Sequence, residues 1–370
     1  MPIRVLVADD SVLFRRVITD ALASLPDVEV VGSAPNGKLA VQRVRELKPD
    51  LLTLDMEMPE MDGLAVLDAL RETHEDTLVI VVSALTQRGG QLTMKALERG
   101  ASDFITKPDT TGAEASRAAI TKELAPRVRA LAHRREIRKI LRDSPQPAPS
   151  KPVPPREKAA APEQPSRTAV RQTVLSKPEM VLIGVSTGGP NALTQILPRI
   201  PGTIGVPLLV VQHMPPVFTQ SLAESLSTKC ALRVREASHG EKLDPNTVYI
   251  APGGKQMRLA SPAGGMKTIE ITDDPPENNC KPAVDYLFRS AANRFPGRSM
   301  AVILTGMGSD GTLGLRLLKR HGCYIIAQDE ATCVVFGMPK AAIDAGVVDV
   351  VLPIDAIPDR IVASVRGFYS

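Results

Sequence analysis

Three carboxylates in the first third of the sequence could act together on a metal ion. Asp9 and Asp10 directly follow an apolar run that is typical of a strand, and Asp55 ends another such run. The carboxyl ends of parallel strands meet at one edge of a sheet, so we expect these side chains to be neighbours. Like charges this close raise one another's pKa unless a hard cation such as Mg²⁺ neutralises them. Taken alone, the pair is as typical of a helix N-terminus, which Asp10 or Ser11 could cap.

Two further polar residues indicate that this acidic group does phosphoryl chemistry. Ser83 and Lys107 end two later strand-like runs, and their hydroxyl and ammonium groups suit the oxygens of a phosphorylated Asp55. The group comprises, in order, Asp9-Asp10, the segment from Asp55 to Gly63, Ser83-Ala84 and Lys107-Pro108. With this set, residues 1 to about 125 strongly resemble the response-regulator receiver family. The resemblance implies a histidine kinase as phosphodonor and the following roles: Asp55 as phosphoacceptor, Asp9 and Asp10 with Asp55 as Mg²⁺ ligands, Ser83 and Lys107 as the switch pair, and Phe104 as the switch aromatic.

A glycine-rich turn in the second half of the chain could present a nucleophile. The apolar run from Val181 to Val185 leads into Gly184-Val185-Ser186-Thr187-Gly188, a G-x-S-x-G pattern. The glycines allow a tight strand-to-helix turn that exposes the Ser186 hydroxyl at a helix N-terminus. Such turns also bind phosphate, and from this stretch alone the two interpretations are equally good. A P-loop would need a Gly-Lys-Ser/Thr ending and a dinucleotide site would need G-x-G-x-x-G, and neither occurs here.

A serine nucleophile near neutral pH needs a histidine base and a group that orients the base. Of the five histidines, only His213 ends an apolar strand-like run; the others lie on expected helices or in a polar turn: His74, His133, His239 and His321. A buried histidine with a satisfied backbone bond is an equally good interpretation of His213. Asp310, in a glycine-rich turn after another apolar run, is the candidate orienting carboxylate, although an Asx-turn or helix N-cap is as typical there. The backbone N–H groups of Thr187 and Met307 could stabilise an oxyanion.

Residues 179–370 resemble, throughout, the catalytic domain of the chemotaxis protein-glutamate methylesterases, the CheB family. The matching stretches are Gly184 to Gly189, Gln212 to Pro215, Tyr249 to Gly254, Pro282 to Asp285 with Leu287-Phe288, and Leu304 to Gly308 with Asp310-Gly311. The resemblance implies Ser186 as nucleophile, His213 as base and Asp310 as orienting carboxylate. It also implies methylated glutamates of chemoreceptor helices as substrates, with release of methanol, and deamidation of receptor glutamines by the same route.

The elements that must position these residues alternate between strand-like and helix-like segments in both halves. Five β-branched runs before residue 106 and six after residue 180 are separated by amphipathic segments of helical length. This pattern predicts an α/β protein with two doubly wound parallel-sheet domains: a (βα)5 flavodoxin-like receiver and a larger α/β hydrolytic domain. The segment from Asp143 to Pro178 has nine prolines among 36 residues and no aromatic residue, which predicts an extended linker. We therefore place the receiver at 1–125, a basic helix with the Pro-rich linker at 126–178, and the catalytic domain at 179–370, with Pro126 as a kink or break in the helix.

Composition narrows the functional classes. The net charge of +4 is concentrated in residues 109–178, which carry 15 basic and 7 acidic side chains. This segment could contact nucleic acid or an acidic partner, but a solvated connecting helix and linker is the better interpretation, and the near-neutral catalytic half argues against a DNA-binding output domain. With no Trp and only 4 Tyr and 7 Phe, the chain has few side chains on which nucleotide bases could stack. The four cysteines form no CxxC pair, and the apolar runs are too short to span a bilayer. We expect a cytoplasmic monomer that neither inserts into membranes nor binds nucleic acid.

The sequence therefore predicts a phosphorylation-regulated serine esterase for chemosensory adaptation, with Mg²⁺ needed for receiver phosphorylation and no cofactor for the esterase. Its expected partners are methyl-accepting chemotaxis receptors and a chemotaxis histidine kinase. We expect the unphosphorylated receiver to block the esterase in part, and phosphorylation of Asp55 to favour an open form. The alternative is a receiver whose output domain is not catalytic and binds a protein partner or a phosphorylated ligand through Ser186.

Overall fold

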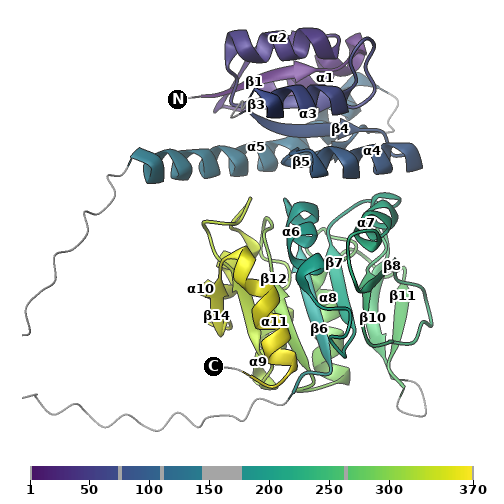
Figure 1. The fold of residues 1–370 in the computed structure, drawn as a ribbon. Coiled ribbons are helices and arrows are strands. Elements are labelled where there is room, and N and C mark those ends of the chain that lie inside the picture. The colour runs from purple at the N-terminus through teal and green to yellow at the C-terminus, as the bar shows by residue number, and fades with distance from the viewer. Residues whose placement is uncertain (1, 74–76, 109–111, 144–176, 262–265, 369–370) are drawn as a thin grey trace, which may run out of the picture.

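The computed structural model describes residues 2–73, 77–108, 112–143, 177–261 and 266–368, with only the backbone described for residues 131–143. The expected Pro-rich linker lies almost entirely outside these residues. The described chain forms two α/β domains, each built on a parallel sheet (Figure 1). Among the described helices none is both long enough and apolar enough to cross a membrane.

The first domain is a five-stranded parallel sheet covered by helices on both faces. Its strand order is β2-β1-β3-β4-β5. The elements are β1 Ile3–Ala8, α1 Val12–Ala23, β2 Val28–Ala34, α2 Gly37–Leu47, β3 Leu51–Asp55, α3 Gly63–Glu72, β4 Leu78–Ser83, α4 Gln87–Glu98, β5 Asp103–Thr106 and α5 Ala113–Asp143. Side-chain oxygens of Ser11, Asn36, Asp62 and Thr86 cap helices α1 to α4. Ser11 is thus the cap of α1, and the Asp9–Asp10 pair is free for another role.

Helix α5 runs without interruption from residue 113 to residue 143 and carries Pro126 in its interior. Pro126 therefore does not divide this segment into two helices. The buried side chains of Ile120, Leu124 and Val128 pack with α1 over one face of the receiver sheet. In Figure 1 the far end of α5 extends beyond the body of the receiver.

The second domain is a seven-stranded, wholly parallel sheet with a separate antiparallel hairpin. The sheet order is β14-β13-β12-β6-β7-β9-β8, and β10 pairs with β11. The elements are β6 Met180–Val185, α6 Gly189–Ile196, η1 Leu197–Arg199, β7 Leu208–Gln212, α7 Phe218–Ser227, β8 Arg233–Glu236, β9 Thr247–Ile250, β10 Gln256–Ala260, β11 Thr268–Thr272, α8 Val284–Arg294, β12 Ser299–Ile303, α9 Thr312–Arg320, β13 Ile325–Gln328, α10 Met338–Asp344, β14 Val350–Leu352, η2 Ile354–Ala356 and α11 Ile357–Val365. The expected doubly wound architecture is confirmed, whereas β8 and the hairpin are additions to the six predicted strands.

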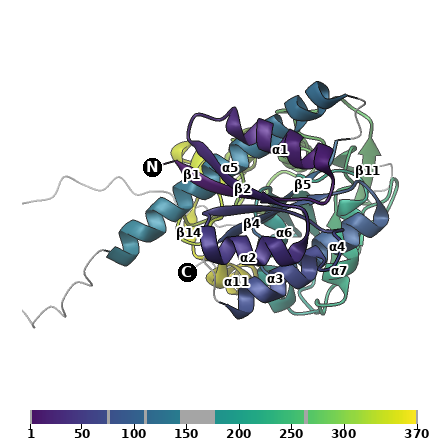
Figure 2. The same ribbon diagram turned by 90° about the horizontal axis from the view of Figure 1, so that it is seen from above.

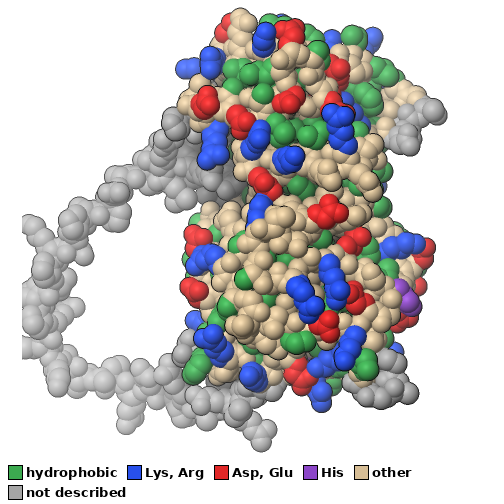
Figure 3. All heavy atoms as spheres, turned by 45° about the vertical axis from the view of Figure 1, so that its right-hand side comes forward, with side chains coloured by type: hydrophobic (Ala, Val, Ile, Leu, Met, Phe, Trp, Pro, Cys, Tyr) green, Lys and Arg blue, Asp and Glu red, His purple; other side chains and the backbone are tan. Residues whose placement is uncertain are grey.

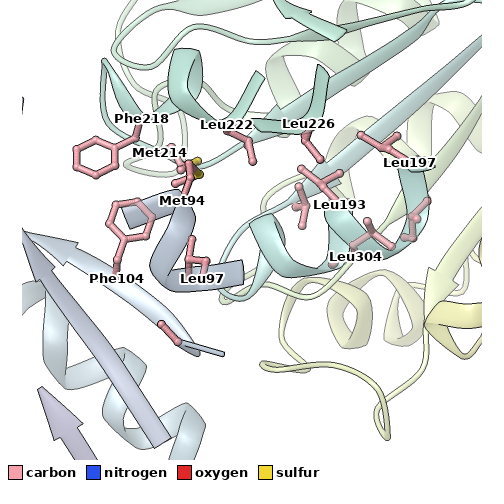
Figure 4. Packing of buried hydrophobic residues seen from close by; sticks show 14 of the residues in the cluster. Met94, Leu97, Phe104, Leu193, Leu197, Met214, Phe218, Leu222, Leu226 and Leu304 are labelled. Carbon is pink, nitrogen blue, oxygen red and sulfur yellow. The ribbon is translucent and has the colours of Figure 1, made fainter. Parts of the chain in front are cut away.

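The receiver sits on the catalytic domain through one continuous hydrophobic cluster (Figures 1 and 2). Met94 and Leu97 on α4 and Phe104 on β5 face Met214 and Phe218, while leucines of α6 and α7 continue the apolar surface (Figure 4). The rings of Phe104 and Phe218 stack with their centroids 4.8 Å apart. Because this patch excludes water from both domains, the contact resembles a domain core more than an incidental touch.

Candidate functional site

The acidic group of the receiver lies at the carboxyl ends of β1, β3 and β5. Lys107 Nζ lies 2.7 Å from Asp55 Oδ2 and 3.0 Å from Asp9 Oδ2. Asp10 is exposed at the rim, and Ser83 and Lys107 line the same cavity of about 250 Å³ with Asp10 and Asp55. The structure thus brings together five of the six receiver residues that the sequence indicated.

The carboxylates of this cavity are arranged for a cation. One oxygen from each of Asp9, Asp10 and Asp55 lies within 4.8 Å of the others. Burial, with a contribution from Asp55, raises the pKa of Asp9 to about 6 in spite of the opposing Lys107 ammonium, and burial also raises the pKa of Asp55. The Asp9 Oδ2 atom is buried and makes no well-directed hydrogen bond with a described residue. A hard divalent ion would supply the missing charge and partner, so these residues fit Mg²⁺.

The sixth receiver residue, Phe104, lies away from the acidic cavity. Its ring is 6% exposed and packs into the domain interface against Phe218. Lys107, which holds Asp55, follows Phe104 by three positions at the end of the same strand. A change around Asp55 can therefore reach the interface through its hydrogen bond with Lys107 and the short stretch of chain from Lys107 to Phe104.

The second polar group lies at the carboxyl ends of β6, β7 and β12, beside the point where the strand order reverses. Ser186 follows β6 in a turn completed by Gly188, whose φ is 74° and whose missing side chain leaves room for Val334. The Ser186 N–H donates to the Thr305 carbonyl, and Gln212 Nε2 donates to the Ser186 carbonyl at 2.9 Å. These bonds hold the backbone of Ser186, while its hydroxyl has no hydrogen bond to any residue in the described part of the chain.

His213 and Asp310 are joined by a direct hydrogen bond. His213 Nε2 lies 2.8 Å from Asp310 Oδ2. Asp310 also accepts hydrogen bonds from the N–H groups of Val284 and Asp285 and from the Asn278 amide. Asp310 therefore caps α8 and not the helix that follows it, which answers the alternative of a simple cap for α9. The same carboxylate orients the imidazole.

Burial and hydrogen bonds together determine the pKa values of His213 and Asp310. Burial alone would lower the pKa of His213, but the hydrogen bonds with Asp310 and Cys280 outweigh it and raise the pKa to about 9. Burial alone would raise the pKa of Asp310, but its bonds with His213 and backbone N–H groups hold the pKa below the usual value. The carboxylate thus keeps its charge and stabilises an imidazolium, as a triad carboxylate must.

Ser186 and His213 line one cavity of about 320 Å³ that both domains build. The catalytic domain also contributes Thr187, Gln212, Met214, Pro215, Asn279, Cys280 and Lys281, and the receiver contributes Asp103, Phe104, Thr106, Glu123 and Arg127. In this conformation His213 Nδ1 faces Cys280 Sγ at 3.6 Å, and no hydrogen bond joins His213 to the Ser186 hydroxyl. The backbone N–H groups of Thr187 and Met307 bond to no described residue and remain available as donors.

Three residues of this site escaped the sequence reasoning. Asn278 bridges Asp285 and Asp310, Gln212 braces the Ser186 turn, and Cys280 contacts the imidazole. Gln212 carried a signal, because it stands beside His213 in a stretch that resembles the family. Asn278 and Cys280 carried none, because their role depends on how the loop before α8 folds back over β12.

Comparison with known proteins agrees with both halves of the chain. The family described as CheB methylesterase matches residues 181–361, and the response regulator receiver domain family matches residues 5–116. A protein-glutamate methylesterase/protein-glutamine glutaminase from Desulfotalea psychrophila is 48% identical over 98% of this chain and 99% of its own length. One of the same name from Nocardioides sp. is 44% identical over 95% and 92%. The crystal structure of the Thermotoga maritima CheB methylesterase catalytic domain is 44% identical, covers 50% of this chain and 98% of its own, and has a TM-score of 0.49.

These relatives are named as enzymes, and they align with this chain over nearly its whole length. A non-catalytic output domain is therefore not favoured. Two parallel-sheet domains, a receiver followed by a methylesterase domain, account for the full alignment. This chain belongs to the CheB family of protein-glutamate methylesterases/protein-glutamine glutaminases.

Proposed function

We propose that this chain is a phosphorylation-controlled serine hydrolase that removes methyl groups from glutamate methyl esters of chemoreceptors. The same site would convert receptor glutamines to glutamates, with methanol or ammonia as the second product. The observation that carries this proposal is that Ser186 and His213 line one cavity, with His213 hydrogen-bonded to Asp310, in a chain of this family.

In the reaction, the Ser186 hydroxyl attacks the ester or amide carbonyl while His213 takes its proton. Nε2 of His213 is held by Asp310, so Nδ1 is the nitrogen that must accept the proton, and Ser186 must approach it. The N–H groups of Thr187 and Met307 would stabilise the oxyanion. His213 then returns its proton to the leaving methoxide or amide nitrogen. Water, activated by the same imidazole, hydrolyses the resulting acyl-enzyme and releases glutamate.

Control would come from the receiver. Asp9, Asp10 and Asp55 would hold Mg²⁺ while a chemotaxis histidine kinase phosphorylates Asp55, and Ser83 and Lys107 would then bind the phosphoryl oxygens. Support comes from the cavity around Ser186, which receiver residues line on one side. A helical receptor segment is too large for a cavity of about 320 Å³, so the receiver would have to move away before receptor substrate binds.

Incubation with methyl-labelled receptor membranes, with and without a small-molecule phosphodonor, tests reaction, substrate and control together. We expect phosphodonor to increase methanol release by the wild type but not by Asp55→Ala. Ser186→Ala should abolish covalent catalysis and leave at most the contribution of binding and the oxyanion donors. The matched control is Ser261→Ala, at an exposed position directly after β10. Release near the wild-type rate by Ser186→Ala would refute the proposed nucleophile.

A further inference from the structure

The thiol of Cys280 lies beside Nδ1 of His213, the ring nitrogen that Asp310 does not contact. Its Sγ atom lies 3.6 Å from His213 Nδ1, and the thiol is partly exposed to the cavity shared with Ser186. The reaction proposed above has no use for this thiol. We propose that Cys280 and His213 form an inhibitory binding site for a thiophilic metal ion such as Zn²⁺.

The separation of the two ligand atoms suits a zinc ion without movement of the backbone. Zinc binds cysteine sulfur at about 2.3 Å and histidine nitrogen at about 2.0 to 2.1 Å with tetrahedral angles, which places the two atoms about 3.6 Å apart. The observed distance between Sγ and Nδ1 is 3.6 Å. The ligands come from different parts of the fold, His213 directly after β7 and Cys280 from the loop before α8. The His213 N–H donates to the Val185 carbonyl, and the backbone of Cys280 exchanges two hydrogen bonds with Glu277.

The group behind the histidine also has the form found at zinc sites. Metal-bound histidines commonly donate their second ring N–H to a carboxylate, which sets the tautomer and raises the basicity of the ligand nitrogen. Asp310 occupies that position at Nε2, and two backbone N–H groups and Asn278 hold it in turn. One ligand atom from each of His213, Cys280 and Asp310 lies within 4.8 Å of the others. Zinc would displace the proton from Nδ1 of the imidazolium, and the proton that remains on Nε2 would be held by Asp310.

The remaining coordination positions open into the cavity. Water can fill them, and the Ser186 hydroxyl lines the same space. A site with two protein ligands and open positions binds metal less tightly than a closed structural site with four. Such a site suits reversible inhibition by changing metal concentration.

Ligand chemistry separates this site from the acidic cavity of the receiver. The receiver offers carboxylate oxygens, which suit Mg²⁺, whereas a thiol and an imidazole favour softer ions. The chain would thus respond to two classes of metal at two places. Inhibition rests on the proposed function, because metal on Nδ1 removes the base that takes the Ser186 proton. Binding of the metal does not rest on it.

The test is a zinc titration of the full chain in excess Mg²⁺, which saturates the receiver site, with a phosphine reductant in place of a dithiol. Zinc affinity is measured by competition with a zinc-sensitive dye, and hydrolysis by methanol release from labelled receptors. We expect Cys280→Ser to weaken zinc binding by more than about tenfold and to raise the half-inhibitory zinc concentration by a similar factor. Cys230→Ser, which alters a free thiol remote from His213, should match the wild type in both assays.

The outcomes separate the metal site from the catalytic assignment. Equal zinc affinity for the wild type and Cys280→Ser would overturn the metal site. Zinc binding that depends on Cys280 but leaves hydrolysis unchanged would support the site and contradict the role of His213 as base. Failure of Ser186→Ala to lose activity would count against the proposed function without touching zinc affinity.

Discussion

At the scale of single residues, the charge on His213 decides whether Ser186 can be activated. The hydrogen bonds of His213 with Asp310 and Cys280 outweigh burial and place its pKa at about 9. Below this pH the imidazole holds its proton and cannot accept another. In the closed conformation the raised pKa of His213 thus disfavours the neutral imidazole that a general base needs, and the receiver also covers this residue.

A pH profile follows from this raised pKa. Hydrolysis by the unphosphorylated wild type should increase with pH with a midpoint near pH 9, as His213 loses its proton. Asp310→Asn removes the charge that favours the imidazolium, so its profile should shift to lower pH while kcat falls by about 10³-fold or more. Methanol release measured from pH 6 to pH 10 checks both. An unchanged midpoint in Asp310→Asn would contradict this account of the His213 pKa.

The same pKa makes a prediction about stability. The folded-state value exceeds the unfolded value of about 6.5, so the contribution of His213 to the free energy of unfolding is fully present below pH 6.5 and is lost as pH rises through 9. We expect the stability difference between wild type and His213→Gln to be larger at pH 6 than at pH 9.5. Denaturant unfolding of both proteins at the two pH values measures it, and a difference that grows with pH would have the wrong sign.

Removal of Mg²⁺ should abolish regulation by phosphorylation and leave the basal rate of hydrolysis unchanged. Asp9 and Asp55 are buried carboxylates with raised pKa values, and Lys107 alone does not neutralise them. Chelation of Mg²⁺ should therefore abolish stimulation by phosphodonor, while basal methanol release persists, because the reaction proposed for Ser186 uses no hard cation. Rates with and without chelator, followed by readdition of Mg²⁺, decide the matter. Stimulation that survives full chelation would exclude a Mg²⁺-dependent receiver.

At the scale of elements, the sequence predicted what periodicity and turn chemistry encode. The five receiver strands and six strands of the second domain were visible as apolar runs, because parallel strands buried on both faces are almost wholly apolar. Strand β8 was not visible, since Arg233–Glu236, at the edge of the sheet, has three charged residues and only one apolar residue. Pro126 was expected as a kink or break; α5 does not break there, and the packing of Ile120, Leu124 and Val128 stabilises the helix on both sides of the proline.

The residues of the candidate active site also divide into those that the strands position and those that an irregular loop positions. Ser186 and His213 directly follow β6 and β7, and Asp310 lies in the turn between β12 and α9, so the parallel topology brings all three to one edge of the sheet. Asn278 and Cys280 reach the site through a loop in which Asn278 and Asn279 both have positive φ. No periodicity describes such a loop, so neither its path nor its contact with His213 could be foreseen from the residues.

The packing of α4 on α7 depends on one missing side chain. A Cβ atom at Gly90 would lie 2.6 Å from Ser221 Oγ, so the two helices approach as closely as a glycine allows. Gly90→Leu should strengthen the intrinsic helix propensity of α4 by about 1 kcal/mol while forcing it away from α7. We expect a folded protein with higher basal hydrolysis and a smaller response to phosphodonor. Gln91→Ala, on the exposed side of α4, is the control and should behave as wild type; unchanged basal hydrolysis in Gly90→Leu would show that this contact does not hold the closed form.

At the scale of the whole molecule, two folded lobes meet at a waist (Figure 3). Charged side chains of both signs are spread over the visible face of both lobes, whereas the waist is held mainly by the apolar cluster of Figure 4. Between the described residues of the two domains polar contacts are few: Asn191 donates to the Ala101 carbonyl, and Glu98 pairs with Lys229 and Ser225 at the edge. Edge ion pairs contribute little to stability, so the closed arrangement depends on apolar burial.

Phe104 belongs to this apolar cluster and lies three positions before Lys107 in the sequence. Removal of its side chain should therefore favour the open form. Truncation of a buried phenylalanine costs about 3 to 5 kcal/mol in a folded core, enough to shift a two-state equilibrium by more than a hundredfold if most of that cost falls on the interface. Phe104→Ala should therefore raise basal methanol release and respond little to phosphodonor, and its radius of gyration by small-angle scattering should exceed that of the unphosphorylated wild type. Phe368→Ala removes a ring that is 65% exposed near the C-terminus and controls for loss of an aromatic side chain. A Phe104→Ala protein that stays compact and keeps the wild-type response would show that the stacked pair does not hold the domains together.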